Sequence, residues 1–295
     1  MDNVWFITGS ARGLGRSLTE AVLARGGRVA ATARQPRQLA ELVTQYGNQI
    51  LPLALDVTNT AQIQEAVAAA VAHFGRIDVV VNNAGFGITG AAEAFTDEQV
   101  RSQLETNLYA PIAVTRAVLP YLRQQRSGHI LQISSVGGRV GNAGLSIYQA
   151  AKFGLGGFTE ALAKEVAPLG IRVTAVEPGG FRTDWAGASM SFAPPIAGYD
   201  AVNQRADFFA SGQFVPVGDP DKAAQVMIDL VGNPAPPVHL VLGSEAVAIL
   251  KQADAARQAE FEHWLPVSVS TDHDAAGNFL DTEMGKSITR ETGRE

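Results

Sequence analysis

Short apolar segments alternate with longer amphipathic segments along most of the chain. Seven apolar segments have the length of buried strands, and they cover residues 4–8, 28–32, 50–54, 79–82, 130–134, 173–176 and 240–242. Several of the segments between them carry apolar residues at three- and four-residue intervals, which is the spacing of one helix face. Strands that alternate with helices are typical of a parallel sheet covered on both faces. We therefore predict an α/β fold of the doubly wound Rossmann type with a seven-stranded parallel sheet.

Polar residues mark where several helices should begin. Thr60 precedes the periodic residues of one helix and can act as its N-cap. Thr96 and Gln99 have the spacing of a capping box, in which each side chain bonds the backbone of the other residue. Asp219 stands directly before a proline and can open a later helix. A longer helix is expected at about 146–166, because proline and glycine follow it.

Two segments break this rhythm. Residues 184–216 are rich in glycine, proline, alanine and serine and also contain aromatic residues, so we expect a lid over an apolar substrate. The polar segment 268–295 is expected to be flexible or to wrap a partner subunit. We therefore predict a single Rossmann-type domain over residues 1–267 and a C-terminal tail over 268–295.

The composition excludes several classes of function. The 295 residues are 46% hydrophobic and 18% charged, and no apolar run approaches the roughly 18 residues that a membrane span requires. No cysteine is present, so disulfides, zinc-thiolate sites and cysteine nucleophiles are excluded. A net charge of −6 argues against nucleic acid as the main partner. The first residues lack the basic region of a secretory signal, so the cytoplasm is the predicted location.

The five histidines do not have the spacing of metal ligands. We therefore predict no metal site, and we expect each histidine at the surface or at a helix end.

A glycine-rich turn follows the first predicted strand and opens the first helix. It reads Thr-Gly-Ser-Ala-Arg-Gly-Leu-Gly over residues 8–15. Glycines permit a tight turn and let backbone N–H groups approach a pyrophosphate, which then lies at the positive end of the helix dipole. The alternative is an ordinary glycine-rich turn. The candidate cofactor-binding residues in this turn are Gly9, Ser10, Arg12, Gly13, Leu14 and Gly15.

The end of the second strand indicates which nicotinamide cofactor is bound. NAD sites place an acidic residue there, roughly 20 residues after the glycines, whereas this chain has Arg34. Arg34 and Arg12 could both bond the 2′-phosphate of NADP(H) with their forked guanidinium groups. We therefore predict that NADP(H) is preferred over NAD(H). The alternative is that both are ordinary exposed arginines.

Tyr148 is the one tyrosine among five that has a lysine four residues later, at Lys152. On a helix this spacing places both side chains on one face, with the ammonium within ~5 Å of the phenol oxygen. At an effective dielectric of about 20, the attraction of ~3 kcal/mol would lower the pKa of Tyr148 by about two units, toward working pH. Tyr148 is therefore predicted to act as a general acid and base.

The order and spacing of these motifs resemble the short-chain dehydrogenase/reductase family, in its short single-domain branch. The resemblance extends over about residues 3–245 and includes strand-end motifs that contact the cofactor in the family. It implies that an adenine-contacting pair, an Asn-Ala-Gly turn and a Pro-Gly turn whose threonine anchors the nicotinamide carboxamide also belong to the cofactor site. These residues are Asp56, Val57, Asn83, Ala84, Gly85, Pro178, Gly179, Phe181 and Thr183.

The resemblance also implies catalytic roles. Ser135 stands thirteen residues before Tyr148, the family's serine-to-tyrosine spacing, and would hold the substrate oxygen. Lys152 would also bond the nicotinamide ribose, so Tyr148 and Lys152 face both substrate and cofactor. Asn107 lies four residues before Pro111, which has no N–H for the Asn107 carbonyl, so the helix should bend there. The freed carbonyl would hold a water of the family's proton relay; a helix merely kinked by proline is the alternative.

The predicted function is an NADP(H)-dependent oxidoreductase that moves a hydride between nicotinamide and a carbonyl/secondary-alcohol pair, with Tyr148 as general acid and base. The pocket should be lined by Gly137, Arg139, Asn142 and Trp185, which indicates a medium-sized, partly apolar carbonyl or alcohol substrate.

Two other functions compete with this prediction. One is a dinucleotide-binding sensor protein that keeps the fold without catalysis. The other is an epimerase or dehydratase of the family's extended branch, which the glycine spacing disfavours. Gly154, Gly156 and Gly157 on the Tyr148 helix suggest close packing of another helix, and we expect a homodimer or homotetramer.

Overall fold

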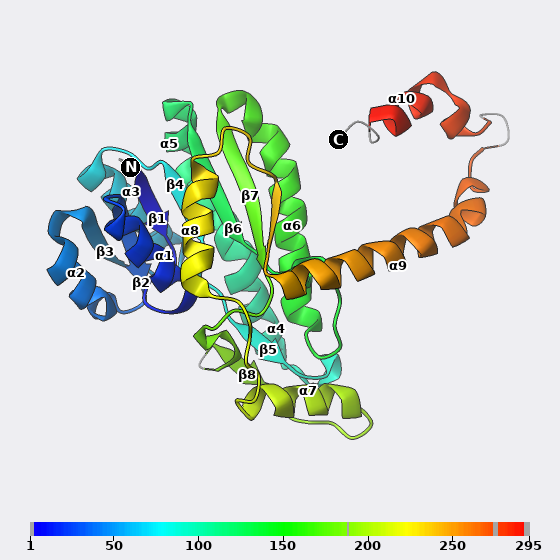
Figure 1. Ribbon diagram of the computed structural model, residues 1–295, viewed down its shortest axis with the longest axis horizontal. Helices are drawn as coiled ribbons and strands as arrows, with labels where there is room; N and C mark the ends of the chain where they lie inside the picture. The colour runs from blue at the N-terminus through cyan, green and yellow to red at the C-terminus, as the bar shows by residue number, and fades with distance from the viewer. Residues whose placement is uncertain (1–2, 188, 274–276, 292–295) are drawn as a thin grey trace. The chain divides into compact units, whose positions relative to one another are not determined.

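The sheet at the centre of the structure has seven parallel strands, as predicted (Figure 1). The computed structural model describes residues 3–187, 189–273 and 277–291. The strand order is β3-β2-β1-β4-β6-β7-β9. The strands are Val4–Ile7 (β1), Arg28–Ala33 (β2), Ile50–Ala54 (β3), Val79–Asn82 (β4), Gly128–Ile133 (β6), Ile171–Pro178 (β7) and His239–Leu242 (β9).

The order of the strands reverses between β1 and β4, which pair in parallel. From β1 the chain first builds outward to β2 and β3, and it then returns to add β4 and the later strands on the other side. In open α/β sheets the crevice at the carboxyl ends of the strands beside such a reversal binds ligands. The topology therefore directs the search for a site to the ends of β1 and β4.

Helices cover both faces of the sheet. Because side chains alternate along a strand, Trp5 of β1 packs into one hydrophobic core and Phe6 packs into the other, and both are fully buried. The first core is covered by Gly13–Ala24 (α1), Ala40–Tyr46 (α2) and Pro220–Val231 (α8). The second core is covered by Thr60–Phe74 (α3), Ala110–Gln125 (α5) and Ser146–Val166 (α6).

Three of the predicted helix starts can be compared with observed caps. The Thr96 capping box is present and opens Asp97–Leu104 (α4). Asp219 caps α8 by accepting from the backbone N–H groups of residues 221 and 222. The prediction for Thr60 is wrong by one residue, because the side chain of Asn59 is the cap and Thr60 is already helical. Asparagine is at least as good an N-cap as threonine, so composition alone did not decide between them.

The 184–216 segment has its own secondary structure, at the lower end of the sheet in Figure 1. It contains a 3₁₀ turn at Asp184–Ala186, the short strand Met190–Phe192 (β8) and the helix Asp200–Ala210 (α7). β8 pairs in parallel with Gly87–Thr89 (β5), which directly follows β4. Gly218 bonds the backbone on both sides of Phe181, so the two ends of the segment are tied together.

The chain forms two compact units, Met1–Ile249 and Leu250–Glu295. The helix Ser244–Val269 (α9) begins in the first unit, and the second unit also contains Glu283–Glu291 (α10). Within the described residues, no helix is both long and apolar enough to cross a membrane.

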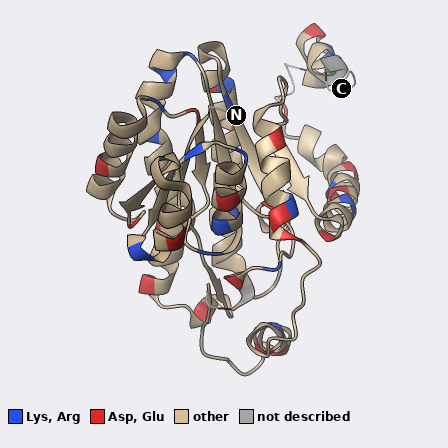
Figure 2. Cartoon of the chain, turned by 60° about the vertical axis from the view of Figure 1, so that its left-hand side comes forward, with Lys and Arg blue, Asp and Glu red and all other residues tan. Residues whose placement is uncertain are grey.

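Charged residues of both signs are scattered over the helices and loops, and the strands are almost free of charge in the view of Figure 2.

Candidate functional site

The glycine-rich turn lies at the end of β1, on the side of the strand-order reversal. Gly9 and Gly13 have φ angles of 71° and 55°, a region that favours glycine. The backbone N–H of Ser10 donates to Thr32 of the neighbouring strand at 2.9 Å. The first turn of α1, which the structure describes in full, carries no acidic residue, and the Arg12 side chain does not cap it. Its backbone N–H groups therefore suit a bound anion.

The Asn-Ala-Gly segment after β4 holds this turn in place. The side-chain amide of Asn83 donates to the carbonyls of Thr8 and Gly9 at 2.9 and 3.2 Å. The Thr8 hydroxyl accepts from the backbone N–H groups of Asn83 and Ala84 at 2.9 and 3.0 Å. A Cβ added at Gly15 would clash with the Asn83 amide nitrogen and the Gly9 carbonyl oxygen. The close packing of turn, helix and strand end therefore requires glycine at this position.

The residues predicted to contact the rest of the cofactor surround the same edge of the sheet. Asp56 follows β3, and its pKa is lowered, first by hydrogen bonds from the hydroxyl and backbone of Thr58 and also by the charge of Arg34. Arg34 is exposed at the end of β2. Thr183 lies across from the glycine turn, because a Cβ added at Gly13 would be 3.5 Å from its Cβ.

Five of these predicted residues pack partly into the protein or close to other elements. Leu14 and Phe181 pack against the first hydrophobic core, and Val57 packs against the second. A Cβ added at Gly179 would lie 3.1 Å from the Cβ of Ala246. Pro178 is the last residue of β7 and pairs with Leu242.

Asn107 is fully buried in a π-helical turn, Glu105–Tyr109, that joins α4 to α5. The irregularity predicted from Pro111 therefore takes the form of a widened turn. The Asn107 side chain donates to the Phe86 carbonyl at 2.7 Å and accepts from the Phe86 N–H at 3.1 Å. A Cβ on Gly85 would lie 3.1 Å from the Asn107 Oδ1. The side chain thus fixes the segment after β4, and the relay through the main-chain carbonyl stays a prediction.

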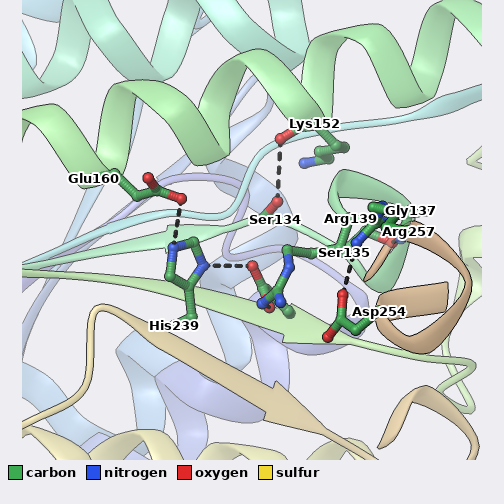
Figure 3. Close-up of polar contacts among 10 residues, drawn as sticks. Ser134, Ser135, Gly137, Arg139, Lys152, Glu160, His239, Asp254 and Arg257 are labelled. Carbon is green, nitrogen blue, oxygen red and sulfur yellow. Dashed lines mark hydrogen bonds and ion pairs between the residues drawn. The ribbon is translucent and has the colours of Figure 1, made fainter. Parts of the chain in front are cut away.

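Tyr148 and Lys152 are both buried on one face of α6. The Lys152 ammonium lies 5.8 Å from the centre of the Tyr148 ring and donates to the Ile133 carbonyl at 2.7 Å. The Ser135 side chain lies near enough to the Tyr148 hydroxyl to lower its pKa. Two hydroxyls and an amine therefore meet at the carboxyl end of β6, and Figure 3 shows Ser134, Ser135 and Lys152 in this region.

The prediction that Lys152 lowers the pKa of Tyr148 is wrong for the protein without cofactor or substrate. Burial raises the pKa of Tyr148 to about 12, although the hydrogen bond from Ser135 acts in the opposite direction. Burial also lowers the pKa of Lys152 to about 8, because a charged amine loses its hydration there. The i, i+4 spacing revealed the proximity of the two groups but not the low dielectric around both.

An aromatic cluster from the 184–216 segment lies against Tyr148. The Trp185 ring is 5.4 Å from the Tyr148 ring and 6.1 Å from the Phe209 ring, centre to centre. Phe214 lies 5.3 Å from Phe209 and 6.0 Å from Phe208. Phe208 is 45% exposed, so the cluster has an open apolar side.

The expectation that every histidine lies at the surface or at a helix end is wrong for two of them. His129 is 3% exposed within β6, and burial lowers its pKa to about 4. His239 opens β9, and its Nδ1 lies 2.7 Å from a carboxylate oxygen of the buried Glu177. The hydrogen bond that His239 donates to that carboxylate raises the pKa of His239. Glu177 was not identified from the sequence as a site residue. The one indication in the sequence is that it is an acidic residue in an otherwise apolar strand segment.

Comparison with known proteins places the chain in a family. Residues 3–192 match the short chain dehydrogenase family. The chain belongs to that family. This short-chain dehydrogenase is 45% identical to oxidoreductase BOA17 of Botryotinia fuckeliana over 273 residues, which cover 92% of this chain and 100% of that relative.

Two solved structures extend the similarity to three dimensions. A short-chain dehydrogenase from Streptomyces avermitilis has a TM-score of 0.88 at 37% identity, with 92% of this chain and 100% of that one covered. A short chain dehydrogenase from Burkholderia cenocepacia in complex with NADP has a TM-score of 0.72 at 26% identity, with 90% and 98% covered. The family and the fold that the sequence motifs implied are therefore confirmed.

Proposed function

We propose that this short-chain dehydrogenase is an NADPH-dependent carbonyl reductase in which Tyr148 donates the proton. The observation that carries the proposal is the buried pair of Tyr148 and Lys152 on one face of α6, with the Ser135 side chain near the Tyr148 hydroxyl. These groups lie at the carboxyl edge of the sheet, where the strand order predicts a ligand site. A dinucleotide sensor would not require three chemically competent groups at this position, two of them, Tyr148 and Lys152, buried.

The fit of the chain to a dinucleotide supports the cofactor. The uncapped first turn of α1 and the left-handed glycines before it offer backbone N–H groups to a pyrophosphate. Arg34 stands where an NAD site would carry an acid, and its guanidinium matches a 2′-phosphate. The NADP in the similar Burkholderia structure supports the same choice.

The proton transfer follows from the positions of the three side chains. A bound NADPH supplies the hydride. Ser135 holds the substrate oxygen by a hydrogen bond, and Tyr148 donates its hydroxyl proton to that oxygen as negative charge develops there. The ammonium of Lys152 stabilises the phenolate that remains on Tyr148. Asn107 holds the backbone of Phe86, in the segment after β4.

The direction of the reaction is proposed from the protonation of Tyr148. With a pKa of about 12, Tyr148 keeps its proton across the physiological range. A protonated phenol can donate to a carbonyl oxygen, whereas alcohol oxidation requires a phenolate. Tyr148 is therefore in the protonated form that carbonyl reduction requires.

The substrate class is proposed from the aromatic cluster next to Tyr148. Trp185 contacts Tyr148, and Phe209 and Phe214 continue the apolar surface away from the reacting hydroxyl. A ketone with a ring or an extended hydrocarbon group would bury that group against these rings. Small polar carbonyl compounds would leave the same surface exposed to water.

The proposed function is tested by measuring cofactor oxidation with NADPH and NADH over a panel of aliphatic and aromatic ketones and aldehydes. We expect turnover with NADPH, with higher kcat/KM for the apolar ketones. The Arg34→Asp variant should lose about 10- to 100-fold in kcat/KM for NADPH, which corresponds to one or two charge-assisted hydrogen bonds.

Arg37→Asp is the matched control, because Arg37 is also exposed, lies three residues away and donates to Gln35. It should leave the cofactor preference unchanged. Equal or better efficiency of the wild type with NADH would contradict the cofactor assignment. Tight NADPH binding with no turnover of any carbonyl compound would favour a dinucleotide sensor instead.

A further inference from the structure

The Glu177 carboxylate is buried at the end of β7, and its side chain is 1% exposed. One carboxylate oxygen lies 2.7 Å from Nδ1 of His239, and the other lies 3.4 Å from Nη1 of Arg139. His239 in turn lies 3.0 Å from an oxygen of Glu160 on α6. Figure 3 shows Glu160 reaching from α6 to His239, and a second dashed line at the other ring nitrogen of His239. A single carboxylate therefore links β7, β9 and the turn after β6.

On one side, this carboxylate holds the turn that carries Ser135. The Gly137 N–H donates to the Ser135 hydroxyl at 3.0 Å, and the Gly138 N–H donates to the Ser135 carbonyl at 2.8 Å. Arg139 ends this tight turn and extends its guanidinium back to Glu177. A Cβ added at Gly138 would lie 2.9 Å from the Lys152 carbonyl, so the turn packs directly on the backbone of α6. A displacement of the turn would therefore be transmitted to Ser135 and Lys152 together.

On its other side, Glu177 directly precedes the Pro-Gly turn. Gly179 donates its N–H to the Leu242 carbonyl of β9 at 3.0 Å, three residues beyond His239. The contact between Glu177 and His239 thus joins β7 to β9 by side chains where backbone pairing also joins them. The turn that leads to Thr183 starts from this reinforced position.

We propose that Glu177 is a positioning residue for the proton-transfer site, holding the Ser135 turn against the strand end that leads into the Pro-Gly turn. The proposal rests on the proposed function, because it assigns Glu177 to that same site. Glu177 acts through Arg139 and His239 and does not touch the substrate.

The chemistry of the group supports positioning over simple packing. Apolar side chains of similar volume often replace a buried ion pair without loss of stability, so stability alone does not call for a charged group here. A carboxylate with two directed partners fixes the orientation of both, and an apolar contact does not. Catalysis by oriented hydroxyls is sensitive to displacements of about 1 Å, which can lower the rate by about 100-fold.

The test compares Glu177→Gln with wild type in NADPH-dependent ketone reduction. A glutamine amide cannot accept from Arg139 and His239 with both of its ends, so one contact is lost. We expect kcat to fall by about 10- to 100-fold while the Kd of NADPH changes by less than about threefold. Glu160→Gln is the matched control, because Glu160 contacts the outer nitrogen of His239 and is 60% exposed. Its kcat should stay within about twofold of wild type.

A double variant, Arg139→Met/Glu177→Met, separates positioning from stability. This variant removes the charges of Arg139 and Glu177 together, so neither charge is left without the other. The melting temperature should therefore recover relative to Glu177→Gln. If Glu177 positions the site, kcat stays low in the double variant although its melting temperature has recovered. Recovery of kcat together with the melting temperature would overturn the proposal.

The proposal and the proposed function can fail separately. Suppose that the wild type reduces ketones and that this activity depends on Tyr148. Full kcat in Glu177→Gln and in the double variant would then overturn only the role of Glu177. Absence of carbonyl reduction in the wild type would overturn the function on which that role rests.

Discussion

Replacing Tyr148 by phenylalanine is expected to lower kcat for ketone reduction by about 1,000-fold, within the range for loss of a general acid. The variant removes one oxygen and keeps the ring that contacts Trp185, so the aromatic cluster stays packed. Ser135 keeps its hydrogen bond from Gly137. The Kd of NADPH, measured by fluorescence titration, should change by less than about threefold, because most of the predicted cofactor contacts lie elsewhere.

Tyr46→Phe provides the matched control for this variant. Tyr46 ends α2 and packs against the first hydrophobic core, away from the carboxyl edge of β6. The same loss of one oxygen there should leave kcat unchanged. Near-normal turnover in Tyr148→Phe would show that another group supplies the proton.

Replacing Gly15 by alanine is expected to raise the Kd of NADPH at least about tenfold, a loss of about 1.4 kcal/mol, and to lower the free energy of unfolding by about 1–3 kcal/mol. The added methyl group would clash with the Asn83 amide nitrogen and the Gly9 carbonyl oxygen. Either the glycine turn moves away from β4 or Asn83 releases it. Both outcomes would disorganise the N–H groups that are proposed to bind the pyrophosphate.

Gly232→Ala is the corresponding control. Gly232 is exposed at the end of α8 with a φ of −76°, and its nearest obstacle for a Cβ lies at 3.4 Å, an ordinary contact. Alanine there should leave NADPH binding unchanged and stabilise the protein by about 0.4–1 kcal/mol, because the unfolded chain becomes less flexible. Unchanged NADPH affinity in Gly15→Ala would mean that the turn does not form the cofactor site.

The fold was predictable because the signals for it are local. A strand buried on both faces is a short, nearly continuous apolar run, as in 79–82, and such runs can be located without tertiary information. The Thr96 capping box and the boundaries of α6 also follow from residues close in sequence. The cap of α3 was placed one residue late because Asn59 and Thr60 are both competent cap residues.

The electrostatics of the site were not predictable in the same way. The spacing of Tyr148 and Lys152 predicts their proximity, but the direction of each pKa shift depends on burial by residues distant in sequence. Glu177 finds its partners 38 and 62 residues away, in Arg139 and His239. The sequence marks such a carboxylate only as an acid in an apolar strand and does not identify what neutralises it.

The central claim is that a protonated Tyr148, assisted by a charged Lys152, delivers the proton during reduction. The most direct measurement is the pre-steady-state rate of NADPH oxidation by a saturating ketone between pH 6 and pH 10. Lys152, with a pKa lowered to about 8, is charged below that pH and loses its charge above it, while Tyr148 stays protonated with a pKa of about 12. The rate should therefore be level at low pH and fall as the pH rises past about 8. A rate that rises with pH over this range would contradict the account, because it would show that reduction requires a deprotonated group.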